Sequence, residues 1–196
     1  MTDKGAPTTD QIIESLLNQE RAEELDQFTV LTFMPIEPHH HVADIGCGPG
    51  YFSIPFAKHL IQGKLYAMDI VDRMLDVLRQ RVNDAKLGNV EILRCEENSF
   101  PVPAGSLDGV FLAFVMHENS DHANLLNAAQ RLLKPYGWCT VLEWYKQETD
   151  SGPPVKVRIA PHELESLAKD IGFEYSSSRN LNGRHYMSVL KKRSSA

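Results

Sequence analysis

Short apolar runs alternate with longer amphipathic segments along most of the chain. The apolar runs have the length of strands, and the segments between them carry apolar residues at helical spacing. This pattern predicts strands at residues 42–45, 64–68, 90–95, 107–115 and 138–144. It predicts helices at residues 51–60, 72–85, 121–133 and 161–171, preceded by two short N-terminal helices at 11–17 and 19–28.

The last part of the chain has the pattern of a hairpin. Gly172 ends the preceding helix, and strands are predicted at 173–180 and 185–190 around the turn dipeptide Asn182-Gly183. Repeated strand–helix alternation implies a parallel sheet covered on both faces, to which the hairpin adds an antiparallel edge. We therefore expect an α/β fold with one domain at 31–196 and a short N-terminal helical cap at 1–30.

A glycine-rich turn follows the first predicted strand. Residues 42–50 read Val-Ala-Asp-Ile-Gly-Cys-Gly-Pro-Gly, and a helix is predicted directly afterwards. Glycine permits positive φ and close approach of a ligand, while a helix start offers free N–H groups. The turn therefore favours a nucleotide-like ligand, although a plain tight turn between strand and helix remains the alternative.

The spacing of the glycines excludes two common nucleotide sites. In the dinucleotide fingerprint counted from Gly46, the third glycine would fall at position 51, which is the bulky Tyr51. A phosphate-binding P-loop requires a lysine, and residues 46–53 contain none. The turn consequently fits neither a dinucleotide nor a triphosphate.

A second acidic position supports an adenosine ligand. Asp69 ends the second predicted strand, about 20 residues beyond the glycine turn, where a carboxylate can accept hydrogen bonds from both ribose hydroxyls. The alternative is that Asp69 caps the next helix. Asp72 suits that capping role better because it directly precedes the amphipathic run.

Composition narrows the partners and the compartment. A chain of 196 residues, 42% hydrophobic and 23% charged, suits one compact domain, and the net charge of −6 disfavours binding to nucleic acid. The apolar run at 110–116 is too short to span a membrane, and residues 1–10 lack a signal-peptide core. Three cysteines without paired spacing suit a reducing compartment. We expect a cytoplasmic protein without a membrane span, and the oligomeric state stays open.

Three consecutive histidines, His39, His40 and His41, precede the first predicted strand. Consecutive residues in an extended chain point in alternating directions, so three in a row are poorly arranged to ligate one ion. We interpret them as a solvated loop and expect no metal site.

Four segments carry a family resemblance. They are residues 42–52, Ala-Met-Asp at 67–69, Cys-Glu-Glu-Asn-Ser-Phe-Pro-Val-Pro-Ala-Gly-Ser-Leu-Asp at 95–108, and Phe-Leu-Ala-Phe-Val-Met-His-Glu at 111–118. In order and spacing the chain, from about residue 20 onward, resembles the class I S-adenosylmethionine-dependent methyltransferases. The resemblance lies within the group (methyltransferase type 11) that includes the UbiE-type quinone-biosynthesis C-methyltransferases. It implies a Rossmann-like, doubly wound, mostly parallel seven-stranded sheet and S-adenosyl-L-methionine as cofactor.

The resemblance also implies a set of cofactor-binding residues. It places the methionine half beside the backbone of Gly46 and Gly48, the ribose on Asp69 and the adenine against Ile70. Either Glu96 or Glu97 would meet the adenine amino group. The complete implied set is Asp44, Gly46, Cys47, Gly48, Gly50, Asp69, Ile70, Glu96, Glu97, Ala113 and Phe114. Asp44 would help to hold the ammonium, and the backbones of Ala113 and Phe114 would approach the methionine portion.

Candidate catalytic residues follow the fourth predicted strand. His117 and Glu118 fall at the carboxyl edge, where open α/β sheets bind ligands, and an imidazole there can deprotonate an acceptor. Packing, or capping of the next helix, is the alternative role for His117. Residues 143–145, Glu-Trp-Tyr, end the fifth predicted strand at the same edge and suit either a pocket wall or strand-end packing.

The resulting hypothesis is a methyltransferase that acts on a small molecule, with the methylated atom (C, O, N or S) left open. Two alternatives remain at this stage: an aminopropyl-transferase-like enzyme of the same fold, and a non-catalytic protein that binds an adenosyl cofactor. Calorimetry with S-adenosylmethionine and with its demethylated product would test the leading hypothesis, because binding of neither compound would contradict it.

Substitution of Asp69 tests the predicted ribose contact. Asp69→Ala should weaken S-adenosylmethionine binding about ten-fold or more, because hydrogen bonds to a charged group contribute roughly 1.5–3 kcal/mol. The measurement is isothermal titration calorimetry. An unchanged dissociation constant would show that Asp69 does not bind the ribose.

Overall fold

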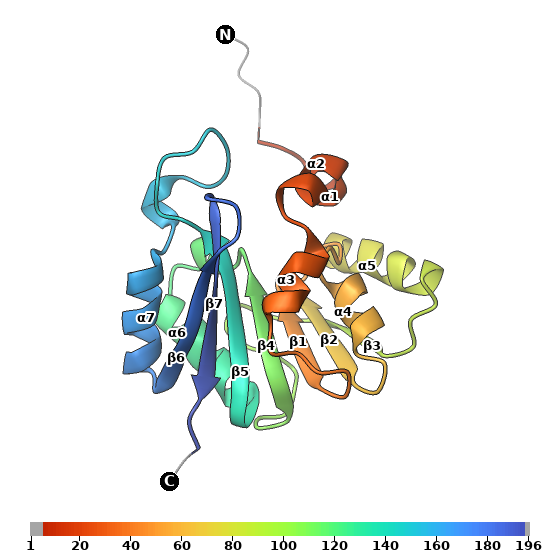
Figure 1. The fold of residues 1–196 in the computed structure, drawn as a ribbon. Coiled ribbons are helices and arrows are strands. Elements are labelled where there is room, and N and C mark those ends of the chain that lie inside the picture. The colour runs from red at the N-terminus through yellow and green to blue at the C-terminus, as the bar shows by residue number, and fades with distance from the viewer. Residues whose placement is uncertain (1–5, 195–196) are drawn as a thin grey trace.

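Residues 6–194 of the chain, described by a computed structural model, form a seven-stranded sheet flanked by helices (Figure 1). The strand order across the sheet is β3-β2-β1-β4-β5-β7-β6. The strands are β1 (His41–Ile45), β2 (Lys64–Asp69), β3 (Val90–Arg94), β4 (Leu107–Ala113), β5 (Leu133–Trp144), β6 (Phe173–Asn180) and β7 (His185–Lys192).

The sheet is parallel over its first five strands and antiparallel at one edge. β1 pairs in parallel with both β2 and β4, so the strand order reverses between β1 and β4. β7 runs antiparallel to β5 and β6, which makes the expected edge hairpin. The expected doubly wound α/β fold is thereby confirmed, and the reversal marks the crevice where such sheets bind ligands.

Helices cover both faces of the sheet, as Figure 1 shows. The helices are α1 (Thr9–Leu17), α2 (Gln19–Glu24), α3 (Gln27–Phe33), α4 (Ser53–His59), α5 (Asp72–Asp84), α6 (His122–Leu132) and α7 (Pro161–Asp170). α3, α4 and α5 pack on one face, and α6 and α7 pack on the other. The strands alternate to serve both layers: in β4, Val110 and Leu112 face α6 while Phe111 packs edge-on against Phe56 of α4.

Several elements differ from the predicted ones. The helix expected at 19–28 is two helices, because Asp26 caps α3 by accepting a hydrogen bond from the N–H of Thr29 at 2.7 Å. Asp72 is the first residue of α5 and not its N-cap, since the cap position is Val71. β5 begins at Leu133, inside the segment predicted to finish a helix, because that residue already pairs with Leu107 of β4.

The helices of residues 6–194 are all too short, or too polar, to cross a lipid bilayer.

Gly109 in the middle of β4 is a tight packing point. A Cβ at Gly109 would lie 2.1 Å from the ring of Trp138, the residue with which it pairs on β5. Gly109→Ala should therefore lower the free energy of unfolding by about 1–3 kcal/mol through overpacking. Urea denaturation measures this, with Gly88→Ala as the matched control because a Cβ there meets nothing within 4 Å. Equal stabilities of the two variants would contradict the packing argument.

Candidate active site

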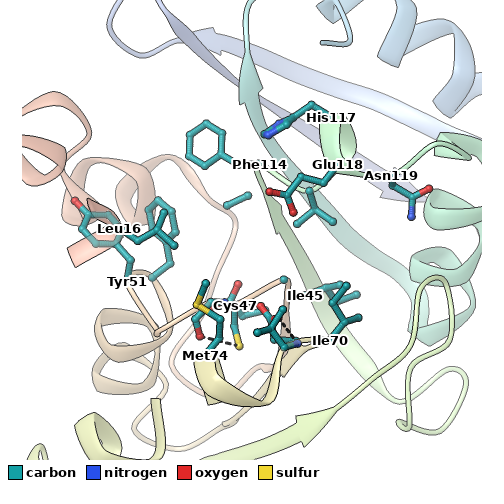
Figure 2. Close-up of a pocket in the computed structure, with 18 of the residues that line it drawn as sticks. Leu16, Ile45, Cys47, Tyr51, Ile70, Met74, Phe114, His117, Glu118 and Asn119 are labelled. Carbon is teal, nitrogen blue, oxygen red and sulfur yellow. Dashed lines mark hydrogen bonds between the residues drawn. The ribbon is translucent and has the colours of Figure 1, made fainter. Parts of the chain in front are cut away.

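A cavity of about 500 Å³ opens at the carboxyl edge of the sheet, beside the reversal of strand order (Figure 2). Its walls come from the N-terminal helices, the glycine turn, the ends of β2, β4 and β5, and the loops that follow β3 and β5. The volume lies in the range of small-molecule sites. The sheet, two loops and the N-terminal helices thus converge on one pocket.

The glycine turn is held against the end of β2. The N–H groups of Gly46 and Cys47 both donate to the carbonyl of Met68, at 2.8 and 3.0 Å. The N–H of Gly48 donates to one carboxylate oxygen of Asp69 at 2.8 Å, and the N–H of Val71 donates to the other at 2.9 Å. Asp69 therefore fixes the turn as well as facing the cavity, and each of its oxygens keeps a lone pair for a further donor.

The turn requires glycine for two different reasons. Gly46 and Gly48 have φ values of 69° and 52° and line the cavity, and a Cβ on Gly46 would meet Val115 at 2.5 Å. Gly50 lies outside the cavity lining, and a Cβ there would meet Leu78 of α5 at 2.3 Å. The first two glycines leave room at the site, and the third permits close packing of α5.

Asp44 is a buried carboxyl at the end of β1. Burial raises its pKa to about 7, the nearby charge of Asp69 adds to the rise, and a hydrogen bond from the Ser53 hydroxyl at 2.6 Å opposes it. Cys47 is buried close by, and burial raises the pKa of its thiol. Among residues 6–194 no cation pairs with Asp44, so a cationic group in the cavity would favour its ionised form.

The other end of the cavity is lined by apolar and acidic side chains together. Ile70 is 47% exposed, and it lies beside Met74 in Figure 2. Glu96 and Glu97 also line this end with exposed side chains. The loop that carries them is tied to the segment after β4 by a hydrogen bond from the side-chain amide of Asn119, the residue after Glu118, to the side-chain oxygen of Asn98 at 3.0 Å.

The chain turns sharply after β4. Phe114 adopts a positive φ of 62°, an uncommon conformation for a residue with a side chain, and its N–H donates to the carbonyl of Leu142 at 2.8 Å. The turn leads into a short 3₁₀ segment, Met116–Glu118. This geometry brings His117 beside the end of β5.

His117 forms a pair with Glu143 of β5. The Nδ1 of His117 lies 3.0 and 3.1 Å from the two carboxylate oxygens of the fully buried Glu143. The backbone N–H groups of His117 and Trp144 donate to the same carboxylate at 3.2 and 3.0 Å. Because a carboxylate accepts hydrogen bonds, Nδ1 carries the proton and Nε2 is left as the basic nitrogen.

Glu118 lies next to this pair and lines the same cavity. Burial raises the pKa of its carboxyl, and the charges of Asp69 and Glu143 add to the rise while His117 opposes it. Figure 2 shows the side chains of His117 and Glu118 above the glycine turn. The cavity therefore holds an imidazole and a carboxyl within one turn of chain.

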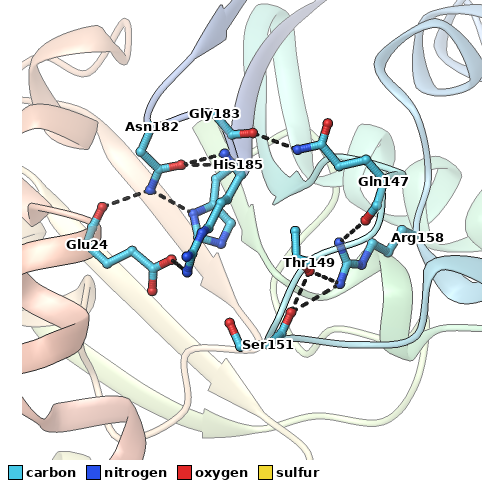
Figure 3. Close-up of polar contacts among 9 residues, drawn as sticks. Glu24, Gln147, Thr149, Ser151, Arg158, Asn182, Gly183 and His185 are labelled. Atoms are coloured by element: carbon cyan, nitrogen blue, oxygen red, sulfur yellow. Dashed lines mark hydrogen bonds and ion pairs between the residues drawn. The ribbon is translucent and has the colours of Figure 1, made fainter.

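Arg158 holds the loop after β5 that forms another wall of the cavity. Its guanidinium lies 5.0 Å from the ring centroid of Trp144 and donates five hydrogen bonds into the loop after β5 (Figure 3). The acceptors are the carbonyls of Tyr145, Gln147, Ser151 and Pro153 and the hydroxyl of Thr149. This loop presents Gly152 and Pro153 to the cavity beside Trp144.

The cavity brings together all of the predicted site residues except Gly50. Trp144 also lines it, whereas Tyr145 does not. The sequence did not predict that residues of the N-terminal helices, Asn98 and Asn119, or the loop at Gly152-Pro153 would line the cavity. The Ser-Gly-Pro-Pro run at 151–154 was a detectable loop signal, but nothing in it indicated which way the loop folds. The lining residues that were missed include Ile12, Leu16, Arg21, Asn98, Asn119, Gly152 and Pro153.

The fold and the cavity together indicate which class of ligand this protein binds. The pocket has apolar side chains at Ile70 and Met74, a carboxylate at the end of β2, a glycine turn in which a Cβ on Gly46 would clash, and several acidic groups. These features suit an adenosyl compound that carries positive charge, as S-adenosylmethionine does on its ammonium and sulfonium groups. The protein is a domain built to bind an adenosyl cofactor.

Comparisons with known proteins agree. Residues 42–137 match the family described as "Methyltransferase domain". The chain is 26% identical over 174 residues to a ubiquinone/menaquinone biosynthesis C-methyltransferase UbiE of Marinomonas sp., covering 72% of this chain and 69% of the relative. It is 31% identical over 108 residues to a demethylmenaquinone methyltransferase of Listeria welshimeri, covering 55% and 46%. A crystal structure of a SAM-dependent methyltransferase from Aquifex aeolicus superposes with a TM-score of 0.86 at 29% identity, covering 95% of this chain and 99% of that one.

The chain belongs to the class I S-adenosylmethionine-dependent methyltransferases, and its similarity is to the UbiE-like group. It is therefore an enzyme whose cofactor is S-adenosyl-L-methionine. This confirms the activity and the cofactor expected from the sequence, and it does not favour the aminopropyl-transferase and non-catalytic alternatives.

The buried carboxyl of Asp44 predicts a pH-dependent stability. Its pKa is about 7 in the folded protein and about 3.9 in an unfolded chain, so the folded state holds the proton more tightly between these values. Wild-type stability should consequently fall as the pH rises from about 4 to about 7, by about 2–4 kcal/mol, and this loss should be absent in Asp44→Asn. Urea unfolding of the ligand-free proteins at pH 5 and pH 8 measures it. A difference between the two proteins that does not change with pH would contradict the assignment.

Proposed function

We propose that this enzyme methylates a small-molecule acceptor that must lose a proton on reaction, with His117 as the general base. The observation that supports this is the pair of His117 with the fully buried Glu143 at the edge of the cavity. Glu143 holds the proton on Nδ1 and fixes the plane of the ring, which leaves Nε2 to take a proton from the acceptor. Glu118 adds a second polar group at the same place.

We also propose the residues that hold the cofactor. Asp69 accepts hydrogen bonds from the ribose hydroxyls with the lone pairs that Gly48 and Val71 leave free. Ile70 lies against the adenine, and Asp44 faces the ammonium. The other proposed contacts are the backbones of Gly46, Gly48, Ala113 and Phe114, the side chain of Cys47, and the carboxylate of Glu96 or Glu97.

When bound, S-adenosylmethionine supplies a methyl group activated by a sulfonium centre. The chain's contribution is alignment and proton removal: the turn and Asp69 hold one partner, and the wall formed by Phe114, Trp144 and Pro153 confines the other. Alignment of two reactants contributes roughly 7–11 kcal/mol to the lowering of a barrier. His117 adds the proton transfer.

The names of the relatives suggest the acceptor. They act in ubiquinone and menaquinone biosynthesis, and one is a demethylmenaquinone methyltransferase. A reduced quinone ring suits the site, because loss of a hydroxyl proton places negative charge on the ring carbon that would form the new bond. The aromatic wall of Phe114 and Trp144 suits a planar ring.

The first 30 residues act, in our proposal, as a cap over this site, and residues 6–30 of it are described. Ile12, Leu16 and Arg21 of the cap line the cavity. The cap is tied to the β6–β7 hairpin, since Glu24 accepts hydrogen bonds from Asn182 at 2.8 Å and Arg184 at 3.0 Å (Figure 3). We expect Ile12, Leu16 and Arg21 to cover the bound cofactor. We also propose that the enzyme is cytoplasmic.

Replacement of His117 tests the base. His117→Ala should lower kcat about 100-fold or more while the dissociation constant for S-adenosylmethionine stays within about two-fold of wild type. Transfer of a labelled methyl group to reduced demethylmenaquinone, or to a panel of hydroxylated quinones, measures kcat, and calorimetry measures binding. A kcat equal to that of wild type would show that His117 is not the general base and only packs against its neighbours.

Glu143→Gln is the matched variant for the positioning role. The amide keeps the size and part of the hydrogen bonding but lacks the charge that holds Nδ1–H, so kcat should fall while KM for the acceptor changes little. A change in KM alone would indicate that Glu143 shapes the pocket and does not act through His117.

The same assay tests the acceptor class. Absence of label transfer from the wild-type enzyme to any hydroxylated quinone would contradict the proposed acceptor class.

A further inference from the structure

The cavity contains a cationic side chain for which the sequence predicted no role. Arg21, on α2 of the cap, lines the cavity together with the proposed cofactor residues. Its guanidinium carbon lies 5.0 Å from the ring centroid of Tyr51 and 5.2 Å from that of Phe114. Two aromatic rings therefore hold the charged group at the pocket by cation–π contact.

In the described part of the chain this guanidinium forms no ion pair, and the nearest carboxylate that acts on it is that of Glu24. The Nε atom is buried without a hydrogen-bond partner, and no residue within 6–194 accepts a hydrogen bond from the Arg21 side chain. Glu24, one turn further along the same helix, pairs with Arg184 at 3.0 Å. Burial lowers the pKa of Arg21, and the nearby groups Tyr51 and Glu24 only partly oppose this effect. An anionic ligand group would relieve the cost of this burial.

The charges of the cavity indicate which anionic group would suit Arg21. The cavity lining carries five carboxyl groups (Asp44, Asp69, Glu96, Glu97 and Glu118), and Arg21 is the one arginine or lysine among the lining residues described. S-adenosylmethionine carries two cationic groups, which suit the carboxyl groups, and a single carboxylate, which they repel. Arg21 is the group that compensates for this repulsion.

The position of Arg21 agrees with that assignment. Tyr51 directly follows the glycine turn after β1, and Phe114 directly follows β4, so the guanidinium lies where the strand order reverses. Asp69, the proposed ribose ligand, lies at the end of β2, on the other side of β1. An adenosyl compound with its ribose on Asp69 would extend its amino-acid portion toward β4 and Arg21.

We propose that Arg21 binds the α-carboxylate of the methionine portion of S-adenosylmethionine. The planar guanidinium offers paired N–H donors that match the two oxygens of a carboxylate. The rings of Tyr51 and Phe114 hold these donors in place, so the cap recognises the one part of the cofactor that the sheet, with its acidic groups, repels. The inference rests on the cofactor site proposed above and is independent of the acceptor and of His117.

Binding of two ligands to Arg21 variants distinguishes a contact between Arg21 and the ligand carboxylate from a general change in the pocket. S-adenosylhomocysteine carries the carboxylate, and 5′-methylthioadenosine has the same adenosine and sulfur but no amino-acid portion. In calorimetry, Arg21→Met should weaken S-adenosylhomocysteine binding about ten-fold or more and leave 5′-methylthioadenosine binding unchanged. Arg21→Lys should recover part of the loss, since it keeps the charge without the paired donors.

A matched control addresses the cap itself. Arg184→Met removes the ion pair that ties α2 to the hairpin but leaves the cavity lining intact, so it should bind both ligands like wild type. Equal loss of both ligands in Arg21→Met would show that Arg21 only holds the cap in place, and would overturn the proposal. Unchanged binding of S-adenosylhomocysteine would overturn it as well, and would leave a carboxylate on the acceptor as the candidate anion.

Titrations of the wild-type protein and of Asp69→Ala show whether a failure lies with the Arg21 proposal or with the proposed cofactor site. If wild type binds S-adenosylhomocysteine and Asp69→Ala binds it about ten-fold or more weakly, the cofactor site is supported, and the Arg21 variants test the carboxylate contact alone. Thermal unfolding of each variant checks that it folds. Should Arg21→Met fail to fold, Arg21→Gln and Arg21→Lys with the same two ligands decide the question.

Discussion

The site depends on three hydrogen bonds that fasten the glycine turn to the end of β2. Two turn N–H groups share the carbonyl of Met68, and a third reaches the carboxylate of Asp69. The backbone can present these N–H groups only because Gly46 and Gly48 accept positive φ. The turn, the proposed ribose ligand and the edge of the sheet therefore form one rigid unit. A ligand that binds there meets groups already held in position, so little ordering is needed on binding.

Much of this unit was predictable because it is local in sequence. The order of strands and helices followed from hydrophobic spacing, and the cofactor class followed from the turn together with Asp69. The N-cap Asp26 and the early start of β5 were missed because they depend on a single side-chain hydrogen bond and on pairing with a distant strand. Boundaries are set by such contacts, which the spacing of apolar residues does not encode.

Residues that act through tertiary contact were the least predictable. Glu143 was visible as a polar residue at the end of a strand, but its pairing with His117 depends on the turn at Phe114, whose positive φ precedes His117 in the chain. Arg21 lies in a polar helical segment that resembles a solvated surface, and it enters the pocket because Tyr51 and Phe114 meet there. Neither contact joins residues that are close in sequence, so no motif could contain it.

Helices α1 and α2, which we propose act as a cap, bury few side chains. Ile13 is the buried side chain of α1, α2 has none, and the ion pairs of these helices, Asp10 with Arg73 and Glu24 with Arg184, are exposed to solvent. Exposed pairs of this kind contribute roughly 0–1 kcal/mol each and weaken further with salt. Displacing the first two helices would thus leave the sheet and its two packed faces intact. A local opening of α1 and α2 would uncover Ile12, Leu16 and Arg21 at the cavity without disturbing the glycine turn or the strand ends.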